Sequence, residues 1–174
     1  DLKPIMFDPK FENKTVDLAS GIDNVKASSN NFYEGVTQKE VEEYYDAKMT
    51  KDDTQPISWG LNSKMVKENG VVTEKVWKVG GMYSRSMEQM VYWLKKAVNV
   101  AENDQQKLTL SLLVEYFKTG DLKKWDEYNI AWVSDVNSRL DVVNGFIEVY
   151  DDAIGKRGAF ESVVSLKDMI ATKR

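Results

Sequence analysis

Glu148 and Tyr150 are the residues of this sequence whose types and spacing are best suited to binding a ligand. They alternate with apolar residues in the run from Phe146 to Tyr150, a spacing that puts both side chains on one face of a β-strand, about 7 Å apart. A carboxylate beside a phenol, backed by Phe146, suits an ammonium group, because Glu supplies the counter-charge and Tyr a hydrogen bond or a ring face. An ordinary half-solvated strand has the same spacing, so the residues alone leave both interpretations open.

Several kinds of active site are excluded by composition, because the 174 residues contain no His and no Cys. Without imidazole there is no Ser-His-Asp triad and no His-based zinc site, and without a thiol there is no thiolate nucleophile or thiolate zinc site. The pairs Asp52-Asp53 and Asp151-Asp152 lack the alternating oxygen ligands of a calcium loop, so we interpret them as solvated turn carboxylates. What remains for chemistry is carboxylates, Lys, Tyr, Ser and Thr, and a metal bound here would be a hard ion that prefers oxygen ligands. Among these residues we single out no catalytic residue, no metal ligand and no cofactor site.

The charge of the chain is close to balanced, with 24 Lys and Arg against 28 Asp and Glu and a formal net charge of −4. Nothing in this balance indicates a nucleic-acid partner, and no apolar run approaches the roughly 20 residues that cross a bilayer. We therefore expect no nucleic acid and no membrane partner. Because a chain without Cys fits any redox compartment, the location is unknown from these residues, with the cytoplasm as the expectation.

The distribution of apolar and turn-forming residues predicts a folded domain behind an irregular start. Pro4, Gly21 and the polar residues 26–31 interrupt any periodicity in residues 1–35, which we expect to be irregular. Residues 36–174 are expected to form a single domain, since an apolar content of 42% is enough for a packed core. The first residue is Asp and not Met, which indicates a processed or excised piece of a longer chain.

Local signals predict a helix and then a hairpin in the first half of this domain. Thr37 and Glu40 have the spacing of a capping box, which predicts a helix over residues 38–49. The dipeptide Asn69-Gly70 supplies the backbone angles of a type I′ turn and lies between two runs of strand-forming residues. It predicts a hairpin of residues 64–68 and 71–79.

The second half of the domain is predicted to begin with helices and to end with strands. Apolar residues recur at helical spacing over residues 83–101, and Asn103 and Asp121 can each cap a further helix. β-Branched and aromatic residues in 140–150 predict a strand, and residues 159–166 form either a second strand or a short helix. The fold class is therefore α+β, with mixed or antiparallel strands packed with a helical hairpin.

The strand predicted over residues 140–150 has one purely apolar face, formed by Val143, Gly145, Ile147 and Val149. We predict that this face packs on the core and that the opposite face, with Glu148 and Tyr150, opens to solvent or to a groove. A one-residue slip in register would exchange the two faces. It would bury an unpaired carboxylate, which is strongly unfavourable.

The run Gly-Phe-Ile-Glu-x-Tyr at residues 145–150 is the most distinctive motif of the chain. Further distinctive stretches lie at residues 77–81, 91–94 and 116–133, within a region that extends from residues 27–30 to residues 158–161. Through these stretches the chain resembles the bacterial branch of the dipeptidyl peptidase III family, peptidase family M49. The family usually has Pro where Ala153 stands here, a departure that concerns only the geometry of the turn.

The resemblance implies a two-lobed zinc exopeptidase that removes dipeptides from the N-termini of short peptides. In the family the zinc ligands belong to an HExxGH helix and an EExRA(E/D) segment that come later in the chain. This sequence is then expected to be an internal piece of the lobe that lacks zinc, inactive alone, with zinc present only in the full-length enzyme. The residues matching Glu148 and Tyr150 would bind the free N-terminus of the substrate, and Glu161 would lie near the same pocket.

Two functions from different classes stay open. One is the substrate-anchoring part of a dipeptidyl peptidase III-like enzyme, whose partners would be a short peptide and the missing zinc lobe of the same chain. The other is a non-catalytic peptide-binding or interaction module that shares this lobe. Because removal of the zinc lobe would expose apolar surface, we also expect the piece to form a dimer.

Overall fold

The computed structural model describes residues 1–8, 10–11 and 14–173 of the chain. These residues divide into two compact units, the first formed by residues 1–75 with 148–159 and the second by residues 76–147 with 160–174. The first unit therefore combines the beginning of the chain with a short segment from near its end. That short segment contains Glu148 and Tyr150.

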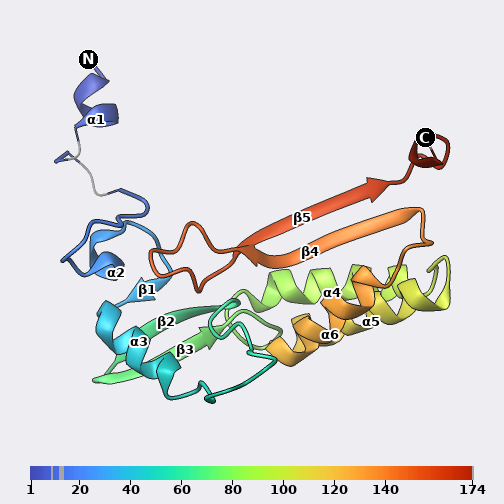
Figure 1. The fold of residues 1–174 in the computed structure, drawn as a ribbon, viewed down its shortest axis with the longest axis horizontal. Coiled ribbons are helices and arrows are strands. Elements are labelled where there is room, and N and C mark those ends of the chain that lie inside the picture. Colours follow the sequence, from blue (N-terminus) through green and yellow to red (C-terminus); the bar gives the residue numbers. More distant parts are fainter. Residues whose placement is uncertain (9, 12–13, 174) are drawn as a thin grey trace. The chain divides into compact units, whose positions relative to one another are not determined.

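The first unit contains a three-stranded mixed sheet and a helix that share one core. Its elements are α1 (Lys3–Phe7), α2 (Asn24–Ala27), β1 (Tyr33–Glu34), α3 (Gln38–Asp46), β2 (Ser63–Glu68) and β3 (Val71–Val76) (Figure 1). The strand order is β1-β2-β3, and β1 is parallel to β2 with Tyr33 opposite Met65. The core of this unit consists of Val25, Val36, Val41, Tyr45 and Met65.

The predicted capping box and the predicted hairpin turn both form in the first unit, although the second strand ends at Val76 and not at residue 79. The Thr37 hydroxyl accepts a hydrogen bond from the Glu40 N–H at 3.2 Å, and the Glu40 carboxylate accepts one from the Thr37 N–H at 3.0 Å. Asn69 and Gly70 have φ angles of 52° and 81°, the positive values that a type I′ turn requires. The capping box determines where α3 begins, and the turn determines how β2 and β3 pair.

Helix α3 ends at Asp46, three residues earlier than predicted. The N–H groups of Lys48 and Met49 bond to carbonyls three residues back, at 2.9 and 3.2 Å, which is the tighter 3₁₀-type ending of many helices. The first 35 residues also differ from expectation, because they contain α1, α2 and β1. Asp23 orders part of this segment by capping α2 through the Lys26 N–H at 3.1 Å.

The second unit is built on three consecutive helices, α4 (Ser84–Val98), α5 (Asp104–Thr119) and α6 (Leu122–Val133). Helix α5 packs against both of the others, and its side chains Leu113 and Phe117 are fully buried. Asn103 caps α5 by accepting from the Gln106 N–H at 2.9 Å, and Asp121 caps α6 by accepting from the Lys123 N–H at 2.9 Å. Both predicted caps are thus confirmed.

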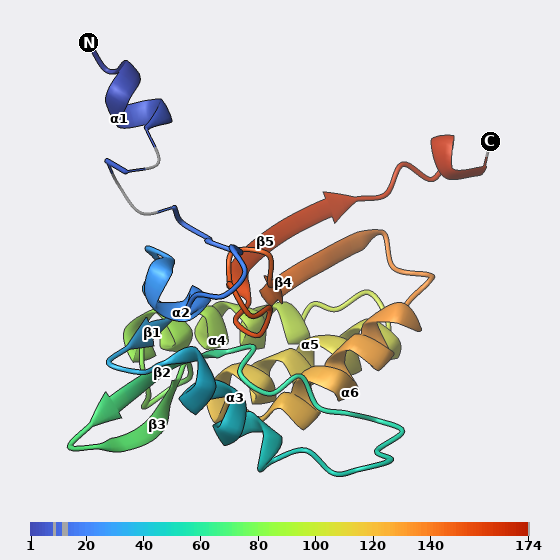
Figure 2. The ribbon, with the colours of Figure 1, turned by 60° about the vertical axis from the view of Figure 1, so that its left-hand side comes forward.

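Strands β4 (Leu140–Glu148) and β5 (Ala159–Leu166) form a two-stranded antiparallel sheet that runs beside the helices, and a short 3₁₀ helix, η1 (Ala171–Lys173), follows (Figures 1 and 2). The Tyr128 hydroxyl donates to the Val142 carbonyl at 3.1 Å and joins α6 to β4. Residues 159–166 are therefore a strand and not a helix. The expected α+β class is confirmed.

The predicted division of β4 into one core face and one open face is wrong. Phe146, on the face assigned to solvent, is only 5% exposed and packs against Trp77 and Phe160, with ring centroids 4.6 and 5.4 Å away. Val143, Ile147 and Val149, assigned to the core, are only half-buried. The reason is that both faces of β4 are covered, since Gly145 on the other face lies against the Trp125 ring.

Candidate substrate-anchoring site

Glu148 and Tyr150 both belong to the first unit, and both side chains are exposed to solvent. Glu148 is the last residue of β4, while Tyr150 lies beyond the strand in the turn that follows and is 70% exposed. Because Tyr150 is outside the strand, the alternation of strand faces places Glu148 but not Tyr150. Glu161, the third predicted residue, is half-buried on β5 in the second unit.

Asp152 closes the turn that carries Tyr150. Its Oδ2 atom accepts hydrogen bonds from the N–H groups of Lys156 and Arg157 at 2.9 and 2.8 Å. The same oxygen accepts the Tyr33 hydroxyl of β1 at 2.7 Å. With a side chain only 4% exposed, Asp152 is not the solvated turn carboxylate that the sequence suggested. It is a buried acceptor that ties the turn to the sheet of the first unit.

Arg157 lies fully buried between two tyrosine rings. Its guanidinium carbon is 4.9 Å from the centroid of the Tyr33 ring and 5.0 Å from that of the Tyr45 ring, within the range of cation–π attraction. Its Nη2 donates to the Tyr45 hydroxyl at 2.5 Å, whereas Nε and Nη1 have no hydrogen-bond partner among the described residues. The side chain is thus held mainly by its contacts with the two rings.

Hydrogen bonds to the backbone of the same turn, one of them from the Asn30 side chain, hold both of its ends. The Gly158 N–H donates to the Leu61 carbonyl at 2.8 Å, and the Asn30 amide donates to the Asp151 carbonyl at 3.3 Å. Burial raises the pKa of the Tyr33 phenol well above its ordinary range, although the nearby Arg157 cation opposes this shift. Tyr33 therefore stays protonated and keeps donating to Asp152 at any physiological pH.

Glu74 is the negative centre of the hydrogen-bond network next to Arg157. Its carboxylate accepts from the Tyr45 hydroxyl at 2.5 Å, the Lys48 ammonium at 2.6 Å and the Ser63 hydroxyl at 2.8 Å. Burial raises the pKa of Glu74, but hydrogen bonds from these three donors lower it further, so the net pKa lies below the ordinary value. Burial likewise raises the pKa of Tyr45 above its usual range.

Asp152, Arg157 and Glu74 were not predicted from the sequence as parts of a site. Their partners are distant in the chain: Tyr33 is 119 residues from Asp152, and Tyr45 is 112 residues from Arg157. Asp152 carries only the weak signal of an acidic residue in a turn that contains Gly. No local pattern distinguishes Arg157 from a surface arginine.

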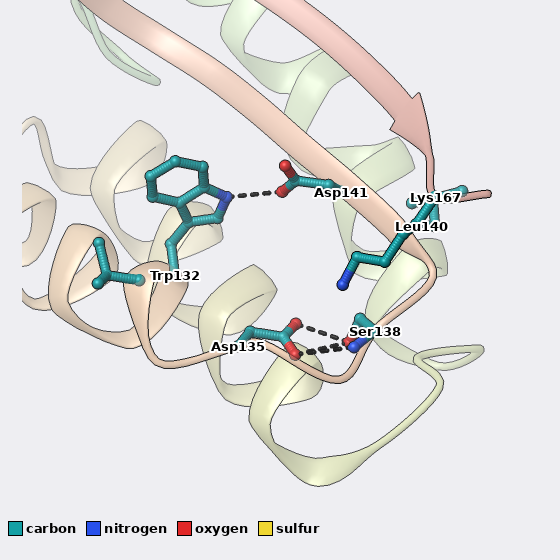
Figure 3. Close-up of a pocket in the computed structure, with 7 residues that line it drawn as sticks. Trp132, Asp135, Ser138, Leu140, Asp141 and Lys167 are labelled. Carbon is teal, nitrogen blue, oxygen red and sulfur yellow. Dashed lines mark hydrogen bonds between the residues drawn. The ribbon is translucent and has the colours of Figure 1, made fainter. Parts of the chain in front are cut away.

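A separate open pocket of about 310 Å³ lies in the second unit, where α6, β4 and the end of β5 meet (Figure 3). The polar groups along it bond mostly to one another. The Trp132 indole donates to Asp141 at 2.7 Å, and the Ser138 hydroxyl donates to Asp135 at 2.7 Å. None of its lining residues is a predicted site residue, and its pairing leaves few polar groups free for a ligand.

Metal-binding clusters and membrane-spanning helices are both absent from the described part of the chain. Within it, no group of three or more His, Cys, Asp and Glu side chains could hold a metal ion. These residues therefore do not fit a zinc site, and no catalytic step is assigned to zinc within them. Among the helices described, none has the length and apolar character needed to cross a membrane.

A family model for peptidase family M49 matches residues 58–174. The match covers more than half of the chain, so the chain belongs to peptidase family M49, as the sequence motifs indicated. The matched region includes β4, the turn after it and the segment with Asp152 and Arg157. Of the partners of these two residues described above, Tyr33 and Tyr45 lie before the matched region.

Proteins named dipeptidyl peptidase 3 are among the relatives of the chain. The rat protein is 34% identical over 93 residues, which is 52% of this chain and 13% of that protein. The human protein is 31% identical over 86 residues, 49% of this chain and 12% of that protein. The chain thus matches only about an eighth of the length of these curated relatives.

Two solved structures share the fold. The structure of dipeptidyl-peptidase III from Corallococcus sp. strain EGB has a TM-score of 0.63 at 20% identity, over 89% of this chain and 28% of that one. The structure of DPP III from Caldithrix abyssi has a TM-score of 0.65 at 23% identity, over 91% of this chain and 30% of that one. At such identities the likeness establishes the fold alone.

Proposed function

We propose that this chain is the substrate-anchoring part of a zinc-dependent exopeptidase of the dipeptidyl peptidase III type, which releases N-terminal dipeptides from short peptides. Glu148 and Tyr150 bind the free N-terminus of the peptide, and Glu161 is a further substrate-binding residue. The observation that carries the proposal is the position of Glu148. It is an exposed carboxylate in the Gly-Phe-Ile-Glu-x-Tyr run of an M49 chain, beside a turn that buried groups hold in place.

The chemistry of the site favours an ammonium ligand. Glu148 supplies a full negative charge, and the exposed Tyr150 ring and hydroxyl supply a polar and aromatic surface in the same unit. A charge-assisted hydrogen bond from an ammonium to a carboxylate is short and about twice as strong as a neutral one. Selection for a free N-terminus follows, because an acylated terminus has neither the charge nor the three donors.

The zinc ion of the proposed enzyme lies outside the described residues. Since these residues do not fit zinc, the zinc ion and its ligands belong to another part of the same polypeptide, which faces this one across the peptide. We place the enzyme in the cytoplasm. Fractionation of cells that produce the intact polypeptide, meaning the full-length protein to which we propose this chain belongs, tests this location.

The central test compares Glu148→Gln with wild type in the intact polypeptide. The variant keeps the size of the side chain but removes its charge, so we expect KM for an unblocked peptide to rise by roughly tenfold to a hundredfold. We expect kcat and zinc content to change little, because the lost interaction is with the bound terminus. Glu127→Gln on α6, an exposed carboxylate that pairs with Lys124, is the matched control.

An N-acetylated copy of the same peptide sharpens this test. Wild type should discriminate strongly against the acetylated peptide, and Glu148→Gln should lose most of that discrimination. Unchanged KM in Glu148→Gln, or equal use of both peptides by wild type, would overturn the assignment of Glu148. Peptide binding by an intact polypeptide that releases no dipeptide would instead identify a non-catalytic peptide-binding module.

A further inference from the structure

The turn after β4 contains a buried cation, Arg157. The stability of the fold alone does not explain why a cation is present there. Arg157 is 0% exposed, and among the described residues its guanidinium makes one hydrogen bond, to the Tyr45 hydroxyl. No carboxylate of the described residues forms an ion pair with it. A buried charge carries a large desolvation penalty, and apolar residues of similar volume often replace buried ionic groups at no loss of stability. A guanidinium in this position therefore points to a role in function.

The surroundings of Arg157 are shaped for a planar cation. Tyr33 and Tyr45 present their rings to it. Gly60 has a φ of 93°, and a Cβ atom at this position would overlap Nη1 of Arg157. The backbone there can approach the guanidinium closely only because the residue is glycine. The same tyrosines connect it to negative groups, since Tyr45 donates to Glu74 and Tyr33 donates to Asp152.

The segment that Arg157 belongs to is the one that carries the proposed anchoring residues. Residues 148–159 pack with the first unit, although the strands on either side of this segment belong largely to the second. Asp152 and Arg157 are its buried polar residues, and their side chains bond to β1 and α3. The position of Glu148 and Tyr150 is thus set by groups beneath the turn and not by the β4–β5 sheet alone.

We propose that Arg157 is a positioning residue that, together with Asp152, fixes the turn carrying Glu148 and Tyr150 in the geometry that binds the substrate's ammonium group. This proposal rests on the proposed function. Arg157 does not touch the peptide. It acts through the turn, so its replacement should affect the binding of an unblocked peptide and should do so only while Glu148 is present.

The experiment is a double-mutant cycle in the intact polypeptide with Arg157→Lys and Glu148→Gln. Lysine keeps the charge but loses the planar guanidinium that contacts both rings. We expect Arg157→Lys to raise KM for an unblocked peptide about tenfold with kcat within about twofold, the pattern of lost ground-state binding. In the Glu148→Gln background the same change should alter KM less than about twofold, since residues that act as one unit are not additive.

Hydrogen exchange supplies a readout that does not depend on activity. Arg157→Lys should accelerate exchange of the Lys156 N–H, which bonds to Asp152, and leave the β2–β3 ladder unchanged. Arg85→Lys, at an exposed position on α4, is the matched control and should change neither KM nor exchange. If Arg157→Lys does not fold, Tyr33→Phe replaces it in the cycle, because it removes one hydroxyl from Asp152 and keeps the ring against the guanidinium.

The outcomes separate the two proposals. Additive effects of Arg157→Lys and Glu148→Gln on KM, with Glu148→Gln itself raising KM, would overturn the positioning role and leave the proposed function standing. An unchanged KM in Glu148→Gln would overturn both, because the turn would then have no anchor to position. Equal acceleration of exchange in the turn and in the β2–β3 ladder would show that Arg157 serves global stability only.

Discussion

Among the single residues of the first unit, Glu74 is a carboxylate that keeps its charge although it is partly removed from water. Three close donors bond to it, and their combined effect leaves its pKa below the ordinary value of 4.5 despite burial. A carboxyl whose pKa is lower in the folded than in the unfolded state stabilises the fold above its unfolded pKa. That contribution is lost as the pH falls through the folded pKa.

Glu74→Gln should therefore destabilise the chain at neutral pH and weaken its acid sensitivity. We expect the free energy of unfolding at pH 7 to fall by about 1–3 kcal/mol, the typical loss when one partner of a buried charged hydrogen bond is removed. Below the unfolded pKa the difference from wild type should shrink. Urea denaturation across acidic and neutral pH measures both effects. Glu68→Gln, which loses only the exposed pair with Lys75, should change stability little, and an equal effect of the two variants would contradict the prediction.

The sequence singled out Glu148 and Tyr150 as candidate ligand-binding residues, but it did not single out Asp152 and Arg157, which hold the turn between them and β5. Glu148 and Tyr150 could be named because a carboxylate and a phenol at alternate positions fit an ammonium group, although an ordinary half-solvated strand has the same spacing. The roles of Asp152 and Arg157 depend on their hydrogen bonds with Tyr33 and Tyr45, which lie more than 100 residues away in the sequence. A buried arginine without a carboxylate partner has no signature in a local stretch of sequence.

At the scale of elements, the contact between β4 and α6 depends on a missing side chain. A Cβ atom on Gly145 would lie 2.5 Å from Cη2 and 2.6 Å from Cζ3 of Trp125. Trp125 is itself buried and packs against the Tyr116 and Tyr128 rings, with ring centroids 4.9 and 5.1 Å away. The indole therefore has little freedom to retreat, and β4 can lie this close to α6 only with glycine at this position.

Gly145→Ala should lower the free energy of unfolding by about 1–3 kcal/mol, the usual cost of overpacking a filled site. Thermal or urea denaturation of the chain measures the change. The control is the same substitution in a Trp125→Phe background, where the ring atoms that would clash are absent and the added methyl should cost much less. A similar loss of unfolding free energy in both backgrounds would show that the effect does not come from the contact with Trp125.

Helices and the hairpin were predictable because their ends are encoded locally. Thr37, Asn103 and Asp121 cap helices within their own first turn, and Asn69-Gly70 determines its own turn angles. The faces of β4 were not predictable, because alternation indicates a core side only when a single face is covered. Here Trp125 covers one face and Trp77 with Phe160 the other, both through tertiary contacts.

For the molecule as a whole, the 174-residue chain alone is expected to release no dipeptide from unblocked peptides, with or without added zinc. The sequence contains no His and no Cys, and the described residues hold no cluster that could bind a metal ion. Without such a ligand set the chain cannot generate a metal-bound nucleophile. Mass spectrometry of peptide digests tests this, with the intact polypeptide as the positive control. Zinc-dependent dipeptide release by the purified chain would contradict it.

The same chain is expected to self-associate through β5. Val163, Val164 and Leu166 are 53%, 65% and 70% exposed, and among the described strands β5 pairs only with β4. An apolar strand with a free edge is a site where another chain can add, and clustered apolar surface drives association. We therefore expect light scattering to show a dimer that forms with rising concentration and is strengthened by sulfate salts, which favour apolar burial.

Val164→Lys should shift this equilibrium toward monomer, because a charge on the strand opposes both apolar contact and edge pairing. Val100→Lys is the matched control: it makes the same change at a valine that is 79% exposed but lies after α4, outside the β5 surface. Circular dichroism should show both variants folded. Equal weakening of the dimer by the two substitutions would indicate a general effect of charge on association, and a wild-type monomer at every concentration would show that β5 does not associate.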